Sequence, residues 1–354
     1  MSRSRALGKW VKLLAIISLV FITATFISIK VMERGKRGQA FEIETFKVHF
    51  WGWVVHYDPK SKESYFKNHE KFTWVSPTWY IVNEEGRVVE IYYDEELVRR
   101  SREWNIKVIP LIANKDFDPA IVHMILSDEN LRKNVIESII RIVLERGYDG
   151  INIDFEGIPA EDRELLNKFV LELSFELHKY DRILTIDVPA KTRDVKTGWA
   201  GAFDYAFLGR YCDLVIIMIY DYHWSGSKPG PISPLGWFKD VLRYAKTVIP
   251  KEKIVAGIPF YGYDWIIGGR GKGVTYDGAI NIAKKYGATI VFSEEEGEAY
   301  FKYSKNGEQH EVWFNTAEST RLRLSVAISM GIKKIAAWRI GQEDPKTWDL
   351  IEKP

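Results

Sequence analysis

Eight short apolar or β-branched runs, separated by longer amphipathic stretches, constrain the fold of this 354-residue chain most strongly. The runs are Lys47–Val55, Phe72–Ser76, Lys107–Ala113, Gly150–Phe155, Ile183–Pro189, Leu214–Tyr220, Ile254–Tyr261 and Ile335–Ile340. Between most of them, apolar residues recur at three- and four-residue spacing, as in Glu129–Gly147 and Ala160–Tyr180, which is the periodicity of an amphipathic helix. Repeated strand–helix units imply a parallel sheet, and eight of them predict a closed (β/α)8 TIM barrel.

The interval before the last run is too long for a single helix. It contains a predicted helix at Tyr276–Tyr286 and several short alternating runs, with "KNGE" at 305–308 as a hairpin signal. We therefore expect a small α+β insertion at about residues 264–315, between strands seven and eight of a barrel that spans residues 41–354. The glycine-rich stretch Gly268–Gly273 lacks the Gly-Lys-Ser/Thr of a phosphate loop, so we expect a flexible loop at the rim of a cleft.

The positive charge is concentrated in the first 40 residues. Residues 1–40 carry eight Lys and Arg against one acid, a net of +7. Since the whole chain is +2, residues 41–354 come to 2 − 7 = −5. A mildly acidic body has no general affinity for nucleic acid, so no nucleic-acid partner is expected.

The basic leader contains an uncharged run, Leu13–Ile29. Its seventeen residues reach the lower end of the roughly 17–25 that a helix needs to span a bilayer. The alternative is a cleaved signal peptide, because Gly38 and Ala40 form an A-x-A-like arrangement, although a charged stretch separates them from the apolar run. We expect an uncleaved single-pass anchor in residues 1–40, and both interpretations place the body outside the cytoplasm.

Two carboxyl groups close the fourth predicted strand. In "INIDFE", Ile151 to Glu156, polar and apolar residues alternate, so Asp154 and Glu156 leave the same side of the strand, about 6.6 Å apart at ~3.3 Å per residue. Barrel enzymes carry their active sites at this end of the strands. Two carboxyls so close in a partly buried cleft cannot both ionise easily, so the pKa of one rises and it can serve as a general acid. The alternative is a pair that caps the helix starting at Ala160 or that bonds to Arg163.

The sequence offers no metal or cofactor site. The single Cys212 excludes an intramolecular disulfide and a Cys-rich zinc site. The seven histidines include no H-E-x-x-H pattern.

Four motifs, in register, resemble the signature segments of glycoside hydrolase family 18, the chitinase-like enzymes. "DGINIDFE" at 149–156 resembles D-G-x-D-x-D-x-E, and "MIYDYHW" at 218–224, followed by "GPISPLGW", resembles the Met-x-Tyr-Asp segment that ends strand six. "GIPFYGYDW" at 257–265 and "AAWRIGQEDPKTW" at 336–348 are similar to the family's segments on strands seven and eight. The resemblance covers nearly all of residues 41–354.

The resemblance implies three catalytic residues. Glu156 would protonate the glycosidic oxygen, and the substrate's own 2-acetamido carbonyl would attack C1, because this family is an exception to the two-carboxylate scheme. Asp154 would accept the acetamido N–H and balance the developing positive charge. Tyr220 would hold the acetamido carbonyl in line. Cleavage of a β-linked N-acetylglucosamine glycan, chitin-type or peptidoglycan, would then retain the anomeric configuration.

The resemblance also suggests substrate-binding residues. Trp338 would form the apolar floor beneath the sugar, and Trp79 and Trp265 are further candidates, with a core aromatic as the alternative for each. Asp221 would touch the sugar or support Tyr220, the alternative being a strand-end cap.

Asn152 departs from the commonest form of the signature, which has an Asp there. We include Asn152 among the substrate-binding residues, and we expect the amide to let Asp154 ionise more readily and to abolish a proton shuttle between the two positions. Members with this Asn resemble spore-cortex N-acetylglucosaminidases. A catalytically silent carbohydrate-binding protein is the competing hypothesis, and the retained Glu156 favours the enzyme.

Overall fold

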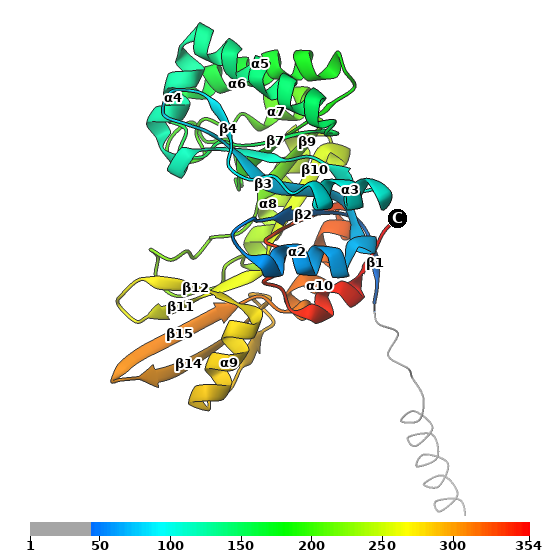
Figure 1. Ribbon diagram of the computed structural model, residues 1–354. Coiled ribbons are helices and arrows are strands. Elements are labelled where there is room, and N and C mark those ends of the chain that lie inside the picture. The colour runs from blue at the N-terminus through cyan, green and yellow to red at the C-terminus, as the bar shows by residue number, and fades with distance from the viewer. Residues whose placement is uncertain (1–43) are drawn as a thin grey trace, which may run out of the picture. The chain divides into compact units, whose positions relative to one another are not determined.

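The structure is a computed structural model in which residues 44–354 are described (Figure 1). Residues 45–354 form one compact unit. The predicted membrane segment, Leu13–Ile29, lies outside the described residues. Within residues 44–354, no helix combines the length and the hydropathy that a membrane crossing requires.

Eight parallel strands close into the predicted barrel. In ring order they are β2 (His49–Val54), β3 (Phe72–Val82), β6 (Leu111–Asn114), β7 (Gly150–Asp154), β8 (Ile183–Pro189), β9 (Leu214–Met218), β10 (Ile254–Pro259) and β16 (Lys334–Trp338). The ring closes where β16 pairs with β2, with Lys334 opposite His49. Two short pairings add to it: β5 (Lys107–Val108) and the antiparallel β4 (Val88–Glu90) both pair with β3. Separately, β1 (Phe46–Lys47) and β17 (Ile351–Glu352) form a two-stranded parallel sheet.

Helices follow most of the strands and cover the outside of the barrel (Figure 1). They are α2 (Pro59–Lys67), α3 (Glu95–Glu103), α4 (Pro119–Ser127), α5 (Glu129–Arg146), α6 (Arg163–His178), α7 (Tyr205–Tyr211), α8 (Leu235–Val248) and α10 (Ala317–Ser329). Short 3₁₀ turns are η1 (His69–Lys71), η2 (Lys115–Phe117), η3 (Ala160–Asp162), η4 (Lys251–Lys253) and η5 (Pro345–Leu350).

Local sequence sets the ends of the predicted helices. Helix α5 begins after Asp128, whose carboxylate accepts hydrogen bonds from the backbone N–H groups of Asn130 and Leu131. It ends at Gly147, which has the positive φ of 63° that a glycine adopts without a Cβ penalty. The predicted helix at Ala160–Tyr180 begins as the turn η3 and continues as α6.

The insertion between β10 and α10 is a five-stranded antiparallel sheet with one helix. The strand order is β12-β11-β15-β14-β13, and the elements are β11 (Tyr261–Ile266), β12 (Gly271–Thr275), α9 (Tyr276–Tyr286), β13 (Val291–Ser293), β14 (Glu298–Lys305) and β15 (Glu308–Phe314). The "KNGE" hairpin is confirmed: Lys305 pairs with Glu308, and Asn306 and Gly307 have φ of 53° and 84°, as a type I′ turn requires.

Two predictions at the start of the insertion are wrong. Tyr261, expected to end the seventh barrel strand, begins β11 instead. Gly271–Gly273, expected in a flexible loop, belong to β12 and pair with β11, so that Tyr263 lies opposite Gly273. Glycine is depleted in strands, so this segment carries no strand signal in the sequence. It forms a strand nevertheless, because its backbone pairs with that of β11.

A buried ion pair fixes the insertion to the barrel. Arg323 on α10 and Glu298 on β14 are fully buried, with 2.6 Å between Arg323 Nη2 and Glu298 Oε1. Glu298 also accepts hydrogen bonds from the backbone N–H groups of Ile232 and Ser233, which lie in the loop after β9. A charge pair without solvent needs this full set of partners, so the insertion is held in a defined position.

Candidate active site

A cavity of about 830 Å3 lies at the carboxyl ends of the barrel strands. This volume falls in the range of roughly 300–1,000 Å3 typical of ligand pockets. Its polar lining comes from several strand ends and from the insertion, and comprises Asp154, Glu156, Asp187, Tyr220, Asp221, Tyr261, Tyr263, Arg339 and Gln342. The predicted site residues Asp154, Glu156, Tyr220, Asp221 and Trp338 are therefore brought together, as the strand-end argument requires.

Asp154 is the last residue of β7, and Glu156 follows it on the same side. Asp154 is buried, and its Oδ1 atom has no hydrogen-bond partner. Asn114, at the end of the neighbouring β6, holds the backbone of Glu156 on both sides: its Oδ1 accepts from the Glu156 N–H at 2.9 Å, and its Nδ2 donates to the Glu156 carbonyl at 3.0 Å. The acid is therefore positioned by its main chain, which leaves its side chain free for the cavity.

The alternative for this carboxyl pair, a cap or a bond to Arg163, is not realised. Arg163 forms ion pairs with Asp194 at 3.1 Å and Asp204 at 3.0 Å. Neither Asp154 nor Glu156 caps η3 or α6.

Burial and mutual repulsion raise the pKa values of the carboxyls in the cavity. Burial raises the pKa of Glu156 to about 8, and the neighbouring Asp154 and Asp221 add to the effect. Burial and then Asp187 raise the pKa of Asp154 well above its ordinary value. A carboxyl that keeps its proton near neutral pH can act as a general acid, so the electrostatics suit Glu156 to that role.

Asn152 lies behind the cavity wall and does not line the cavity. It is fully buried; its Oδ1 accepts from Trp53 Nε1 at 3.0 Å and Ser76 Oγ at 3.2 Å, and its Nδ2 donates to Asp187 Oδ1 at 3.0 Å. The prediction that Asn152 contacts the substrate does not fit this position behind the cavity wall. The expectation that the amide lets Asp154 ionise more readily than an Asp at position 152 would stays a prediction, because the raised pKa of Asp154 comes from its burial and then from Asp187.

Asp187 is a site residue that the sequence reasoning missed. It lies on β8 and lines the cavity. A signal was present: Asp187 interrupts the apolar run Ile183–Pro189, and a polar residue in a strand covered on both faces is unusual.

Tyr220 and Asp221 follow β9 directly and lie at the cavity. Burial raises the pKa of the Tyr220 hydroxyl, so it remains a hydrogen-bond donor. Asp221 has a φ of 58°, and its Oδ1 accepts from Tyr261 Oη at 2.5 Å and Tyr263 Oη at 3.1 Å. Both tyrosines belong to β11, so the insertion contributes directly to the site.

The tryptophans divide between the cavity and the core. Trp338 lines the cavity, and its ring meets that of Trp53 edge-on at 5.8 Å. Trp79 and Trp265, expected at the sugar, are only 1% and 0% exposed and do not line the cavity. Trp199, which the sequence reasoning missed, lines the cavity and is 55% exposed; it lies in a long loop after β8, where no periodicity marks it.

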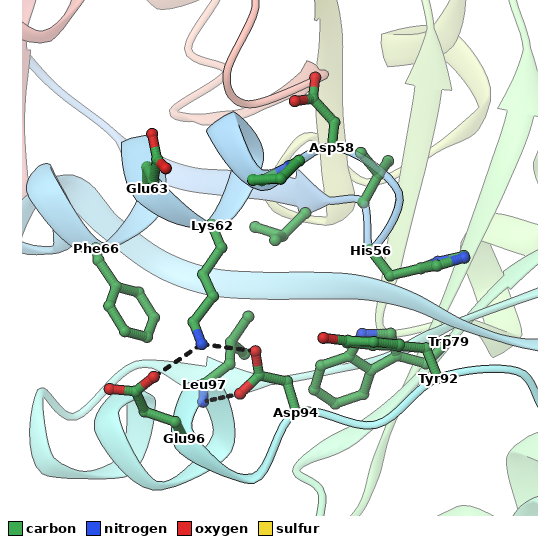
Figure 2. A pocket seen from close by; sticks show the side chains of 13 residues that line it. His56, Asp58, Lys62, Glu63, Phe66, Trp79, Tyr92, Asp94, Glu96 and Leu97 are labelled. Atoms are coloured by element: carbon green, nitrogen blue, oxygen red, sulfur yellow. Dashed lines mark hydrogen bonds and ion pairs between the residues drawn. The ribbon is translucent and has the colours of Figure 1, made fainter.

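A second hollow of about 370 Å3 lies beside the start of α2 and α3. Three of its charged groups bond to one another: Lys62 Nζ lies 2.8 Å from both Asp94 and Glu96, and Figure 2 marks these two ion pairs. Asp58 at its edge pairs with Arg339 at 2.8 Å. Because these charges are already paired, the hollow lacks the poised carboxyls of the large cavity. Within residues 44–354, no cluster of His, Cys, Asp or Glu is arranged to hold a metal ion.

Comparison with known proteins identifies the family. Residues 53–343 match the glycosyl hydrolases family 18, so the chain belongs to this family. A Bacillus subtilis protein named as a sporulation-specific glycosylase, YdhD, is 35% identical over 247 residues, which are 67% of this chain and 59% of that protein. A cortical fragment-lytic enzyme from Bacillus anthracis is 33% identical over 250 residues, 69% of this chain and 58% of that protein.

A solved structure agrees with the fold. The crystal structure of the Bacillus cereus spore cortex-lytic enzyme SleL superimposes with a TM-score of 0.81 at 27% identity, covering 86% of this chain and 74% of that one. The chain spans a little under three fifths of the length of the two Bacillus relatives that it matches by sequence.

Proposed function

We propose that this protein is a retaining, substrate-assisted glycoside hydrolase that cleaves β-linked N-acetylglucosamine-containing glycans. One observation carries the proposal: Glu156, with a pKa raised to about 8, lines a strand-end cavity together with the buried Asp154. An acid that is protonated at neutral pH beside a second carboxyl is what leaving-group protonation requires.

The cavity residues have complementary roles in the first step. Glu156 donates its proton to the glycosidic oxygen as the bond to C1 breaks. The acetamido carbonyl of the same sugar attacks C1 and forms a cyclic oxazolinium. Tyr220 donates a hydrogen bond to that carbonyl and holds it in line. Asp154 Oδ1, which has no partner in the structure, accepts the acetamido N–H and offsets the positive charge.

The second step reverses the role of the acid. Water attacks C1 from the face that the leaving group vacated, and Glu156 accepts its proton. The ring opens, the acetamido group is restored, and the anomeric configuration is retained because C1 has been inverted twice. Trp338 lies at the cavity and offers an aromatic surface for the C–H face of the sugar.

The names of the relatives favour bacterial cortex or peptidoglycan glycan over chitin as substrate. Two of them are named for lysis of spore cortex or its fragments. We further propose that the body acts outside the cytoplasm, attached through Leu13–Ile29, since that uncharged run with basic flanks has the composition of a membrane anchor.

Product analysis tests the proposed function. Chitooligosaccharides and peptidoglycan are incubated in parallel with wild type and Glu156→Gln, and the products are identified by mass spectrometry. We expect cleavage next to N-acetylglucosamine by wild type only, and poor cleavage of de-N-acetylated chains. Equal inertness of both proteins, with retained sugar binding, would instead support the carbohydrate-binding alternative.

A further inference from the structure

The carboxyl missing at Asn152 is present on the neighbouring strand. Strands β7 and β8 are paired in parallel, with Ile153 opposite Ile186, so the next residues, Asp154 and Asp187, lie side by side at the strand ends. Both line the cavity. The chain therefore has two adjacent aspartates behind Glu156, one on each strand, where the family signature places both on β7.

The hydrogen bonds around Asn152 are arranged for a charged Asp187. The Asn152 Oδ1 atom accepts from Trp53 and Ser76, which fixes its amide nitrogen toward Asp187 at 3.0 Å. An amide N–H donated to a carboxylate favours the ionised form of the acid. Asp154 lacks such a donor at Oδ1. A proton shared between the two aspartates therefore resides on Asp154 in the absence of substrate.

We propose that Asp187 is a positioning residue that replaces the missing carboxyl of the signature: it keeps Asp154 protonated in the free protein and takes up that proton when Asp154 ionises against the substrate. The transfer breaks the O–H bond of Asp154 and forms one on Asp187, so the net charge of the cavity is unchanged. The proposal rests on the proposed function, and it states which aspartate of the same site holds the proton with and without substrate.

The surrounding charges are consistent with this arrangement. The titratable and charged groups that line the cavity with the two aspartates are Glu156 after β7, Tyr220 and Asp221 after β9, Tyr261 and Tyr263 on β11, and Arg339 after β16. Burial raises the pKa of Asp187 well above its ordinary value; the hydrogen bond from the Asn152 amide lessens that rise, and Glu156 adds to it. Because the interaction is mutual, the charge on Asp187 also favours the protonated form of Glu156.

Two variants test the role. Asp187→Asn removes the charge and keeps the shape. The double variant Asn152→Asp/Asp187→Asn exchanges the carboxyl and the amide between the two positions. The carboxyl then lies on β7, and the amide at position 187 donates the hydrogen bond to position 152. Asp162→Asn is the matched control, because Asp162 is buried and bonded to His123 at 2.8 Å but does not line the cavity. Urea unfolding confirms that all three variants fold.

The readouts are kcat, KM and the pH profile of kcat/KM on an N-acetylglucosamine oligomer. We expect Asp187→Asn to lower kcat by about 10- to 100-fold with KM little changed. Its basic limb, set by the proton on Glu156, should move to higher pH, because Asp154 then ionises and carries the negative charge next to Glu156. The exchange variant should regain most of kcat and restore the limb. An Asp187→Asn variant that matches wild type would overturn the proposal. The proposal would also be overturned if Asp187→Asn lost kcat while the basic limb stayed in place and the exchange variant did not recover, because that pattern indicates a purely structural role.

Failure of the proposed function gives a different result. If wild type cleaves no glycan, the carboxyl 13C resonances of the free protein are titrated instead. The ionisation of Asp154 should then move to lower pH in Asp187→Asn. If the titration midpoint of Asp154 is the same in wild type and in Asp187→Asn, the coupling between the two aspartates is rejected, whether or not the protein cleaves a glycan.

Discussion

Replacing the proposed acid should stabilise the protein at alkaline pH. The pKa of Glu156 is raised from 4.5 to about 8 in the folded state, so folding favours the protonated form. The contribution of this group to stability is fully present below pH 4.5 and is lost as the pH rises through about 8. Glu156→Gln removes this titration, because the amide never ionises.

The magnitude follows from the same two values. A gap of about 3.5 pH units at 1.36 kcal/mol each sets an upper limit of roughly 5 kcal/mol. Since the Glu156 side chain opens onto the cavity, water reduces that figure, and we expect about 2–3 kcal/mol. The neighbouring aspartates titrate in both proteins, so the comparison isolates position 156.

The assay is urea unfolding of wild type and Glu156→Gln at pH 4.5 and pH 9. The two proteins should have similar free energies of unfolding at the lower pH, and the variant should be more stable at the higher pH. Glu161→Gln, at an exposed glutamate, serves as the control and should follow wild type. A wild type and a Glu156→Gln variant with the same pH dependence would refute the reasoning, because Glu156 would then ionise as easily in the fold as in the unfolded chain.

Three further predictions concern the site and its support. Tyr220→Phe removes the hydroxyl expected to hold the acetamido carbonyl, so steady-state kinetics should show kcat lowered by about 10- to 100-fold with a smaller change in KM; an equal loss in both would indicate ground-state binding only. Trp338→Ala removes the aromatic surface beneath the sugar and should raise KM about tenfold, whereas an unchanged KM would place the sugar elsewhere. Glu298→Ala leaves Arg323 buried without its partner, and urea unfolding should show a loss of about 3–5 kcal/mol. The pair Lys302–Glu311, in which the lysine is exposed, provides the control, since Lys302→Ala should cost less than about 1 kcal/mol.

The barrel could be predicted because its strands are buried on both faces. Such strands appear in a sequence as short continuous apolar runs, and each of the eight runs overlaps a barrel strand, although β3 continues beyond its run to Val82. The helix at Tyr276–Tyr286 and the "KNGE" hairpin could also be predicted, because their local sequence specifies them. Strand β12 was not, because its glycines carry no strand signal and its pairing with β11 is a tertiary contact.

The site could be predicted where the motif is continuous in the sequence. Asp154 ends β7 and Glu156 follows it by two residues, so alternation alone places them together. Asp187 lies 33 residues after Asp154, and only the register between β7 and β8 makes them neighbours.

Side-chain direction explains the misplaced tryptophans. Trp53 faces the interior of the barrel, whereas Trp79 packs with the helix-covered core outside it. Trp265 packs against Trp313 and Tyr261 at the base of the insertion. Without the register shift between Thr78 and Tyr80 in β3 and the pairing of β11, the sequence could not distinguish these positions from the cavity.

The stereochemistry of the first product tests the central claim most directly. Proton NMR of an N-acetylglucosamine oligomer, recorded within the first turnovers and before mutarotation, reports the anomer that the enzyme releases. Attack by the substrate's own acetamido group, with Glu156 as acid and then as base, predicts that the β-anomer forms first. Initial release of the α-anomer would mean that water attacks C1 directly, and it would contradict the mechanism.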